Sequence, residues 1–112
     1  MDITNETKYV LQILYKEYLD RINNGISKRE AKVFASWHNI YTSLFSNMLE
    51  EDCLESFREL GRADYLNNKW ASNKIWSTQL TDKALISMEN KFKNDMKSLV
   101  KSLLTLKQLL SF

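Results

Sequence analysis

The chain has 112 residues, of which 44% are hydrophobic, 12% aromatic and 27% charged, and its formal net charge is +2. This length allows one domain, and the aromatic content together with the low net charge excludes an intrinsically disordered chain. With no proline and two glycines, the composition favours helices over a turn-rich β-sandwich. Residues 1–56 hold six basic and nine acidic side chains, whereas residues 57–112 hold ten and five. The basic second half admits a polyanionic partner.

The sequence indicates a cytoplasmic, soluble protein. Its single cysteine, Cys53, cannot form an internal disulfide. The N-terminus lacks the basic stretch and apolar run of a signal peptide, and no apolar window approaches the ~18 residues of a membrane span. We therefore expect no membrane partner.

Residues 4–24 have the periodicity of an amphipathic helix, with polar Gln12, Lys16 and Asp20 on the opposite side. This helix is predicted to stop at Gly25, which tolerates a left-handed backbone. Its apolar face consists of Leu11, Leu14, Tyr15, Tyr18 and Ile22.

Ser27 and Glu30 form a capping box that predicts a second helix start. Apolar residues keep helical spacing from Ala31 to Met48, and a break near residues 36–39 predicts two short helices rather than one. Another helix is predicted over residues 50–62, with Asn47 as its cap and Gly61 near its end. Its inward face is expected to carry Leu49, Cys53, Phe57 and Leu60.

Residues 64–80 change to the alternation of β-strands, with a turn at residues 71–74, and predict the only β-hairpin of the chain. Thr81 then caps the next helix, and Leu80 and Leu85 have the spacing of a hydrophobic staple.

Residues 82–110 carry the longest periodic pattern, which predicts one helix of roughly 43 Å that projects beyond the core. Its narrow seam favours pairing with a second copy over lying on an anionic membrane, and leaves parallel and antiparallel pairing open. We expect a division into residues 1–84 and a dimerisation segment, residues 85–112. The seam consists of Phe92, Met96, Leu99, Leu103, Leu106 and Leu110.

Two segments resemble the junctions of a winged helix-turn-helix domain. RELGRADYL at residues 58–66 is similar to a recognition helix that enters the first wing strand, and LTDKALISMENKF at residues 80–92 is similar to the second wing strand entering a helix. Ala84 stands where many small bacterial and phage winged-helix proteins have glycine. Residues 15–34, YKEYLDRINNGISKREAKVF, resemble uncharacterised prophage proteins of low-GC Gram-positive bacteria. The resemblance implies a mainly α fold with one β-hairpin and a long C-terminal helix.

By this resemblance the recognition helix is residues 51–62 and the wing is residues 70–76. The outward face of that helix carries four acids, Glu51, Asp52, Glu55 and Glu59, against two bases, and such a face is repelled by DNA phosphates. DNA contacts are therefore expected from basic groups elsewhere and from the two bases. These candidates are Lys28, Arg29, Lys32, Arg58, Arg62, Lys69 and Lys74.

Three further groups admit two interpretations each. Cys53 and His38 match a nucleophile pair, but we favour a core cysteine and, separately, a partly exposed histidine next to Trp37. Two ligands do not make a closed zinc site. The acidic run from Glu50 to Glu55 is a metal or acid–base cluster or, as we favour, a solvated helix start. Trp70 and Trp76 either pair across the hairpin or stack on a base or partner.

The sequence therefore predicts a dimeric winged-helix protein that binds double-stranded DNA, like a small phage or bacterial regulator. The alternative is a module that binds a host or phage protein through its acidic third helix or its C-terminal helix. No enzyme activity, cofactor or metal is expected, because no catalytic constellation or glycine-rich phosphate loop is present in the sequence.

Overall fold

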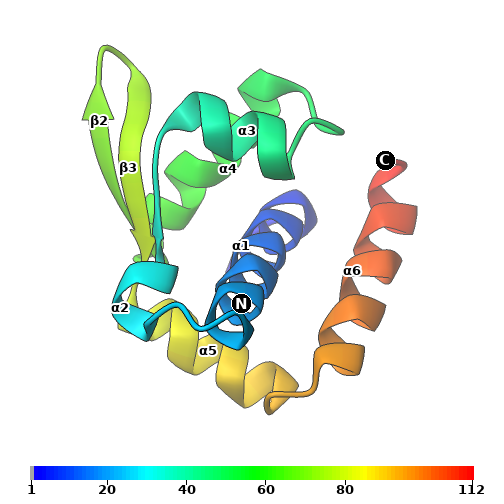
Figure 1. Cartoon of the computed structure of the whole chain (residues 1–112). Coiled ribbons are helices and arrows are strands. Elements are labelled where there is room, and N and C mark those ends of the chain that lie inside the picture. The colour runs from blue at the N-terminus through cyan, green and yellow to red at the C-terminus, as the bar shows by residue number, and fades with distance from the viewer. Residues whose placement is uncertain (1) are drawn as a thin grey trace.

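The computed structural model describes residues 2–112, and within that range it contains six helices and one three-stranded antiparallel sheet. The helices are α1 (Asn5–Asn23), α2 (Lys28–Ala31), α3 (Trp37–Leu44), α4 (Glu50–Arg62), α5 (Asp82–Phe92) and α6 (Met96–Leu110). The strands are β1 (Val33–Phe34), β2 (Leu66–Ala71) and β3 (Lys74–Leu80). In Figure 1, α1 lies centrally, with the β2–β3 hairpin on one side and α6 on the other. The predicted mainly helical fold with a β-hairpin is confirmed.

Short-range capping determines where several helices begin. Thr4 Oγ1 accepts a hydrogen bond from Thr7 N at the start of α1, and Gly25, with φ +88°, follows its end. Ser27 Oγ accepts from Glu30 N at 3.3 Å, and Thr81 Oγ1 accepts from Ala84 N at 3.2 Å. Both predicted caps, Ser27 and Thr81, are confirmed.

The start of α4 differs from the prediction. Leu49 occupies the cap position without a side-chain hydrogen bond, and it is 74% exposed rather than turned inward. Asn47 is not the cap, because its Nδ2 donates to the Tyr9 hydroxyl at 3.2 Å. Tyr9 on α1 holds the Asn47 side chain away from the start of α4. The turn before α4 leaves Leu49 exposed to solvent.

The segment between α2 and α3 contains a strand that the sequence pattern does not reveal. Helix α2 ends at Ala31, whereas the sequence pattern places the break near residue 36. The following strand β1 pairs with β3, with Val33 opposite Gln79 and Phe34 opposite Thr78. Two residues are too few to display an alternation of apolar and polar side chains. The strand is held by this long-range pairing and by Arg21, whose Nη1 donates to the Val33 carbonyl at 2.8 Å.

The hairpin has the predicted turn and places β3 in the centre of the sheet, in the order β1-β3-β2. Ala71 pairs with Lys74 across Ser72 and Asn73, whose φ values of +52° and +66° fit a tight two-residue turn. A register shift after Lys69 brings Ile75 opposite Trp70. Because β3 is the central strand, β2 forms one edge of the sheet.

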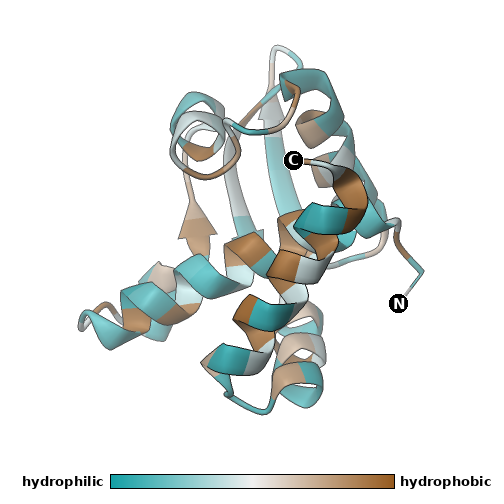
Figure 2. Ribbon diagram, turned by 90° about the vertical axis from the view of Figure 1, so that its right-hand side faces the viewer, coloured by the Kyte–Doolittle hydropathy of each residue, from teal (hydrophilic) through white to brown (hydrophobic). Residues whose placement is uncertain are grey.

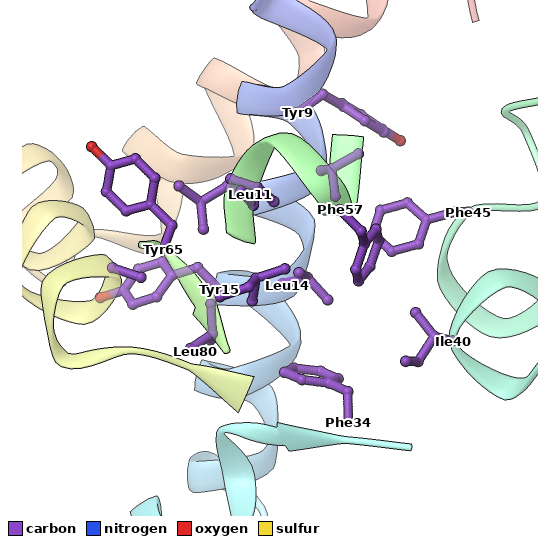
Figure 3. Close-up of a cluster of buried hydrophobic side chains, with 14 of the residues drawn as sticks. Tyr9, Leu11, Leu14, Tyr15, Phe34, Ile40, Phe45, Phe57, Tyr65 and Leu80 are labelled. Atoms are coloured by element: carbon purple, nitrogen blue, oxygen red, sulfur yellow. The ribbon is translucent and has the colours of Figure 1, made fainter. Parts of the chain in front are cut away.

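The core fills the space between α1, the sheet and the α3–α4 pair (Figure 3). Phe57 on α4 contacts Trp37 and Phe45 edge to face, with ring centroids 5.2 and 5.7 Å apart. Cys53 and Leu60 share this buried face of α4, as predicted. Burial of each such side chain stabilises the fold by about 1.5–3 kcal/mol, so this cluster fixes α4 against α3.

The predicted single C-terminal helix is wrong. It breaks after Phe92, where Lys93 and Asn94 adopt left-handed conformations with φ +50° and +61°. Asp95 then caps α6, and α6 folds back alongside α1 (Figure 1). Figure 2 shows that brown apolar residues alternate with teal polar ones around this helix. The apolar face of the amphipathic helix α6 thus packs on α1.

The seam assigned to dimerisation is consequently used within the chain. Leu99 is fully buried, and the radius of gyration of 13.1 Å is that of a compact domain. Heptad spacing indicates that a helix has an apolar face, but not which helix packs against it. The apolar face of α6 packs against α1. The correction applies to Phe92, Leu99, Leu103 and Leu106, which are buried, and to Met96 and Leu110, which are partly buried against the core.

The predicted division between residues 84 and 85 falls within α5, and side chains from both sides of it belong to the same buried cluster. None of the helices described in residues 2–112 combines the length and apolar character that crossing a bilayer requires.

Candidate functional site

A hollow of about 810 Å³ lies between the C-terminal half of α4, the base of the hairpin and the residue after α2. Arg58 and Arg62 border it from α4, and Lys32 borders it from the end of α2. Asn67 and Gln79, which are opposite each other in the sheet, supply amide side chains. The hollow therefore brings three of the predicted basic residues together with groups that donate and accept hydrogen bonds.

Gly61 allows α4 to approach β2 closely at this hollow. A Cβ at Gly61 would lie 2.8 Å from Asn68 Nδ2. That nitrogen donates to the Phe57 carbonyl at 2.8 Å, and Asn68 Oδ1 accepts from Thr78 Oγ1 at 2.6 Å. Gly61 is the penultimate residue of α4, which ends at Arg62 as predicted. Its φ is not left-handed, so glycine serves close packing at this position.

Lys32 also borders two adjoining hollows, one lined with Arg29 and the other with both Lys28 and Arg29. The basic rim, defined as Lys28, Arg29, Lys32, Arg58 and Arg62, therefore follows one continuous surface from α2 to α4. Lys69 on β2 and Lys74 at the start of β3 lie outside the rim on the exposed hairpin. The structure thus brings five of the seven predicted cations together. The acidic residues that line the same hollows are Glu30, Asp64, Asp82 and Glu89.

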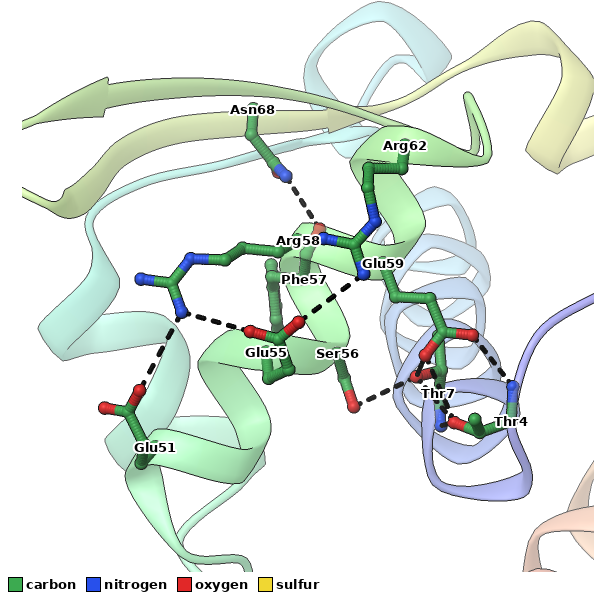
Figure 4. Close-up of polar contacts among 10 residues, drawn as sticks. All are labelled: Thr4, Thr7, Glu51, Glu55, Ser56, Phe57, Arg58, Glu59, Arg62 and Asn68. Carbon is green, nitrogen blue, oxygen red and sulfur yellow. Dashed lines mark hydrogen bonds and ion pairs between the residues drawn. The ribbon is translucent and has the colours of Figure 1, made fainter.

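The two arginines that α4 contributes to the rim, Arg58 and Arg62, are paired with carboxylates of their own helix (Figure 4). Glu55 contacts Arg58 at 3.3 Å and Arg62 at 3.4 Å, and Glu51 lies 3.8 Å from Arg58. Exposed pairs of this kind contribute about 0–1 kcal/mol and are screened by salt. An incoming anion can therefore compete for the arginines.

The three cations on α2 and directly after it have fewer charged partners than Arg58 and Arg62. Lys28, Arg29 and Lys32 form no ion pair with any of the residues 2–112. Lys28 and Arg29 are exposed, and Lys32 is half-buried. The α2 side of the rim is therefore where an external anion meets the least competition.

Glu59 does not belong to the outward acidic face of α4, contrary to the sequence analysis. Its carboxylate accepts hydrogen bonds from Thr7 Oγ1 at 2.7 Å and from Thr4 N at 2.9 Å (Figure 4). Burial alone would raise the pKa of Glu59, but the hydrogen bonds from Thr7 and Thr4, together with nearby Arg62, lower it below the ordinary value. Glu59 thus joins α4 to the start of α1.

The other acidic residues of α4 lie mainly in its first turn. Glu50 Oε2 accepts a hydrogen bond from Trp37 Nε1 at 2.8 Å, and Glu51 and Asp52 are exposed. Among residues 2–112 there is no group of three or more histidine, cysteine, aspartate or glutamate side chains arranged to hold a metal ion. The acidic run complements the helix dipole at the start of α4.

The two tryptophans of the hairpin contact cations rather than each other. The Arg58 guanidinium lies 5.4 Å from the Trp70 ring centroid, and Lys69 Nζ lies 5.7 Å from the Trp76 centroid. The register shift explains why the cross-strand pair, one of the two interpretations of these tryptophans, does not form. Trp70 is 39% exposed and Trp76 is 54% exposed, so both rings remain accessible to a partner.

Cys53 and His38 lie in opposite environments. Cys53 is completely buried, and burial, followed by the charges of Glu6 and Glu50, raises the pKa of its thiol. His38 is exposed on α3. A protonated core thiol lacks the thiolate character of a nucleophile, so the geometry favours the packing role.

Asn67 and Gln79 are site residues that the sequence pattern does not identify. Both line the hollow, and only the strand register shows that they are neighbours. The alternation around Thr78 and Leu80 was the available signal, because it assigns Gln79 to the face away from the core.

Comparison of the chain with protein-family models, with curated proteins and with solved structures gives no match. The geometry of the basic rim and the hairpin is therefore the basis for assigning a function.

Proposed function

We propose that the chain is a winged-helix domain that binds double-stranded DNA through the basic rim and the β2–β3 hairpin. The order of elements supports the proposal: a long helix and a short helix are followed by a short strand, two helices and a hairpin. The unpredicted strand β1 adds to this support, because it extends the hairpin into a three-stranded sheet beside α3 and α4. In this assignment α4 corresponds to the recognition helix, and residues 70–76 correspond to the wing.

The observation that carries the DNA proposal is the continuity of the basic rim. Lys32 borders all three adjoining hollows and connects Arg29 on α2 to Arg58 and Arg62 on α4. Duplex DNA presents one phosphate charge per ~1.7 Å of axis, so a connected series of cations suits it better than isolated charges do. The unpaired cations of α2 contact phosphates in this arrangement, and Lys69 and Lys74 on the hairpin contact the neighbouring backbone.

The acidic first turn of α4 determines which part of this helix faces the DNA duplex. Glu51 and Asp52 repel phosphates, so the C-terminal half of the helix faces the duplex. Arg62, Asn67 and Gln79 then lie nearest to the bases. Guanidinium and amide side chains are the groups that bind guanine and adenine edges through two hydrogen bonds.

Fluorescence anisotropy with a labelled mixed-sequence duplex tests this proposal, measured at several salt concentrations. The variant Arg29→Gln/Lys32→Gln removes two charges from the rim, and Lys97→Gln/Lys107→Gln removes two exposed charges from α6. We expect the first variant to reduce the slope of log K against log salt by about 2, because each lost phosphate contact contributes about 0.9. The second variant should retain the wild-type slope. Absence of binding at low salt, or equal losses in both variants, would contradict the proposal.

A second candidate function, binding of another protein, is favoured by the exposed Arg58–Trp70 contact beside Glu51 and Glu55. Tryptophan and arginine are enriched among residues that dominate protein interfaces. The charge-reversed variant Glu51→Lys/Glu55→Lys separates the two functions. It strengthens DNA binding if DNA is the partner, whereas it abolishes capture of a protein that recognises the acidic face. Unchanged protein capture would count against the acidic face as an interface.

A further inference from the structure

A separate hollow lies on the opposite side of α1 from the hairpin, where α6 runs alongside α1 (Figure 1). Its volume is about 440 Å³, within the range of small-ligand sites. Lys8 and Gln12 border it from α1, Lys91 from the end of α5, and Lys101, Ser102 and Thr105 from α6. The fold-back of α6, which the sequence did not predict, creates this hollow.

The charges around the α1–α6 hollow are all positive. Lys8, Lys91 and Lys101 come from three different helices, and no aspartate or glutamate lines the hollow. None of these lysines forms an ion pair with any of the residues 2–112. Three cations that line one hollow with no acidic residue in its lining raise the local potential and attract an anion.

Gln12 supplies an independent indication of a ligand at the same place. Its side chain is only 1% exposed, and its Oε1 accepts a hydrogen bond from Ser102 Oγ at 2.8 Å. Its Nε2 is buried and has no hydrogen-bond partner among the described residues. Buried amide donors in proteins are almost always hydrogen-bonded, so this nitrogen needs an acceptor that the chain itself does not supply.

We infer that the α1–α6 hollow binds a phosphoryl group carried by a small soluble molecule. The phosphoryl oxygens supply acceptors for the lysines and for Gln12 Nε2, and their charge offsets that of Lys8, Lys91 and Lys101. The volume exceeds that of an inorganic ion alone, which leaves room for a small organic moiety. The inference stands apart from DNA binding, because the basic rim lies on the other side of the molecule.

Titration of the ¹⁵N-labelled chain with inorganic pyrophosphate at constant ionic strength tests the inference. We expect saturable shifts of the Gln12 side-chain amide and of the backbone amides of residues 98–105. The variant Lys8→Gln/Lys101→Gln should raise Kd at least about tenfold. Lys97→Gln/Lys107→Gln, which removes two exposed lysines that do not line the hollow, should leave Kd within about twofold.

Three outcomes would overturn the inference: no saturable shift, shifts spread evenly over the surface, or equal weakening in both variants. Lys97, Lys101 and Lys107 are exposed, Lys8 is half-buried, and none of the four forms an ion pair with the described residues. Circular dichroism is therefore expected to show that both variants retain the wild-type fold. Sedimentation with phosphatidylglycerol–phosphatidylcholine vesicles separates a soluble phosphate from a lipid headgroup. Co-sedimentation that Lys8→Gln/Lys101→Gln abolishes would assign the site to lipid and overturn the soluble ligand, whereas no co-sedimentation supports it.

Discussion

Glu59 Oε1 accepts a hydrogen bond from Thr7 Oγ1 at 2.7 Å across 52 positions of the chain. Together with the hydrogen bond from Thr4 N to Oε2 at 2.9 Å, it fixes the start of α1 against α4. This contact orients the helix that carries Arg58 and Arg62, and so it links the stability of the fold to the geometry of the basic rim.

The variant Glu59→Gln should destabilise the fold by about 1–2 kcal/mol, because it replaces hydrogen bonds to a carboxylate with weaker ones to a neutral amide. Glu55→Gln is the matched control on the same helix. It breaks only exposed ion pairs and should change the free energy of unfolding by less than about 0.5 kcal/mol. Urea denaturation at pH 7 measures both. Equal effects would show that the contact with Thr7 contributes nothing specific.

The contribution of Glu59 should depend on pH. Its folded-state pKa lies below the ordinary value of 4.5, so the stabilisation is complete above that value and is lost as the pH falls through the folded-state pKa. The difference in unfolding free energy between wild type and Glu59→Gln should therefore shrink below about pH 4.5 and remain constant between pH 6 and 8. Burial, with the charges of Asp52 and Glu59, raises the pKa of neighbouring Glu6, so Glu6 titrates above Glu59. A difference that grows on acidification would contradict the assignment.

Gly61→Ala should destabilise the fold by about 1–2 kcal/mol, although alanine is favoured over glycine by about 1 kcal/mol within a helix. The added Cβ would displace the Asn68 amide from its bonds to Phe57 and Thr78. A double-mutant cycle with Asn68→Ala isolates this contact. In the Asn68→Ala background the same substitution should be neutral or stabilising. A stabilising effect in the wild-type background would refute the close-packing role.

Leu103→Ala should destabilise the fold by about 2–4 kcal/mol, because Leu103 is 6% exposed and its loss leaves a cavity between α6 and α1. Leu104→Ala, one position along and 58% exposed, should cost less than about 0.5 kcal/mol. Thermal unfolding at several protein concentrations measures the difference. If the destabilisation by Leu103→Ala depended strongly on protein concentration, this face of α6 would pair with a second copy of the chain. That result would contradict its packing on α1 within one chain.

The features that the sequence predicted well are those determined over short distances. Ser27 and Thr81 cap helices through residues three positions away, and the turn at Ser72 and Asn73 is local in the same way. The apolar face of α4 at Cys53, Phe57 and Leu60 follows from helical periodicity alone.

The features that it missed depend on tertiary partners. Strand β1 exists because of pairing with Thr78 and Gln79, more than forty positions away. The break at Lys93 and Asn94 has no glycine or proline to mark it, and the apolar period continues on both sides. The sequence could select the five cations of the basic rim by their charge, but their continuity through Lys32 requires the packing of α2 against the sheet.

The most direct test of DNA binding by the basic rim is a map of backbone amide shifts as an unlabelled mixed-sequence duplex is added to the ¹⁵N-labelled chain. DNA binding through the rim and the hairpin predicts shifts at residues 28–32 and 67–76, with residues 50–52 and 100–104 unchanged. Shifts confined to α6 or to the acidic first turn of α4, or no shifts at low salt, would contradict it.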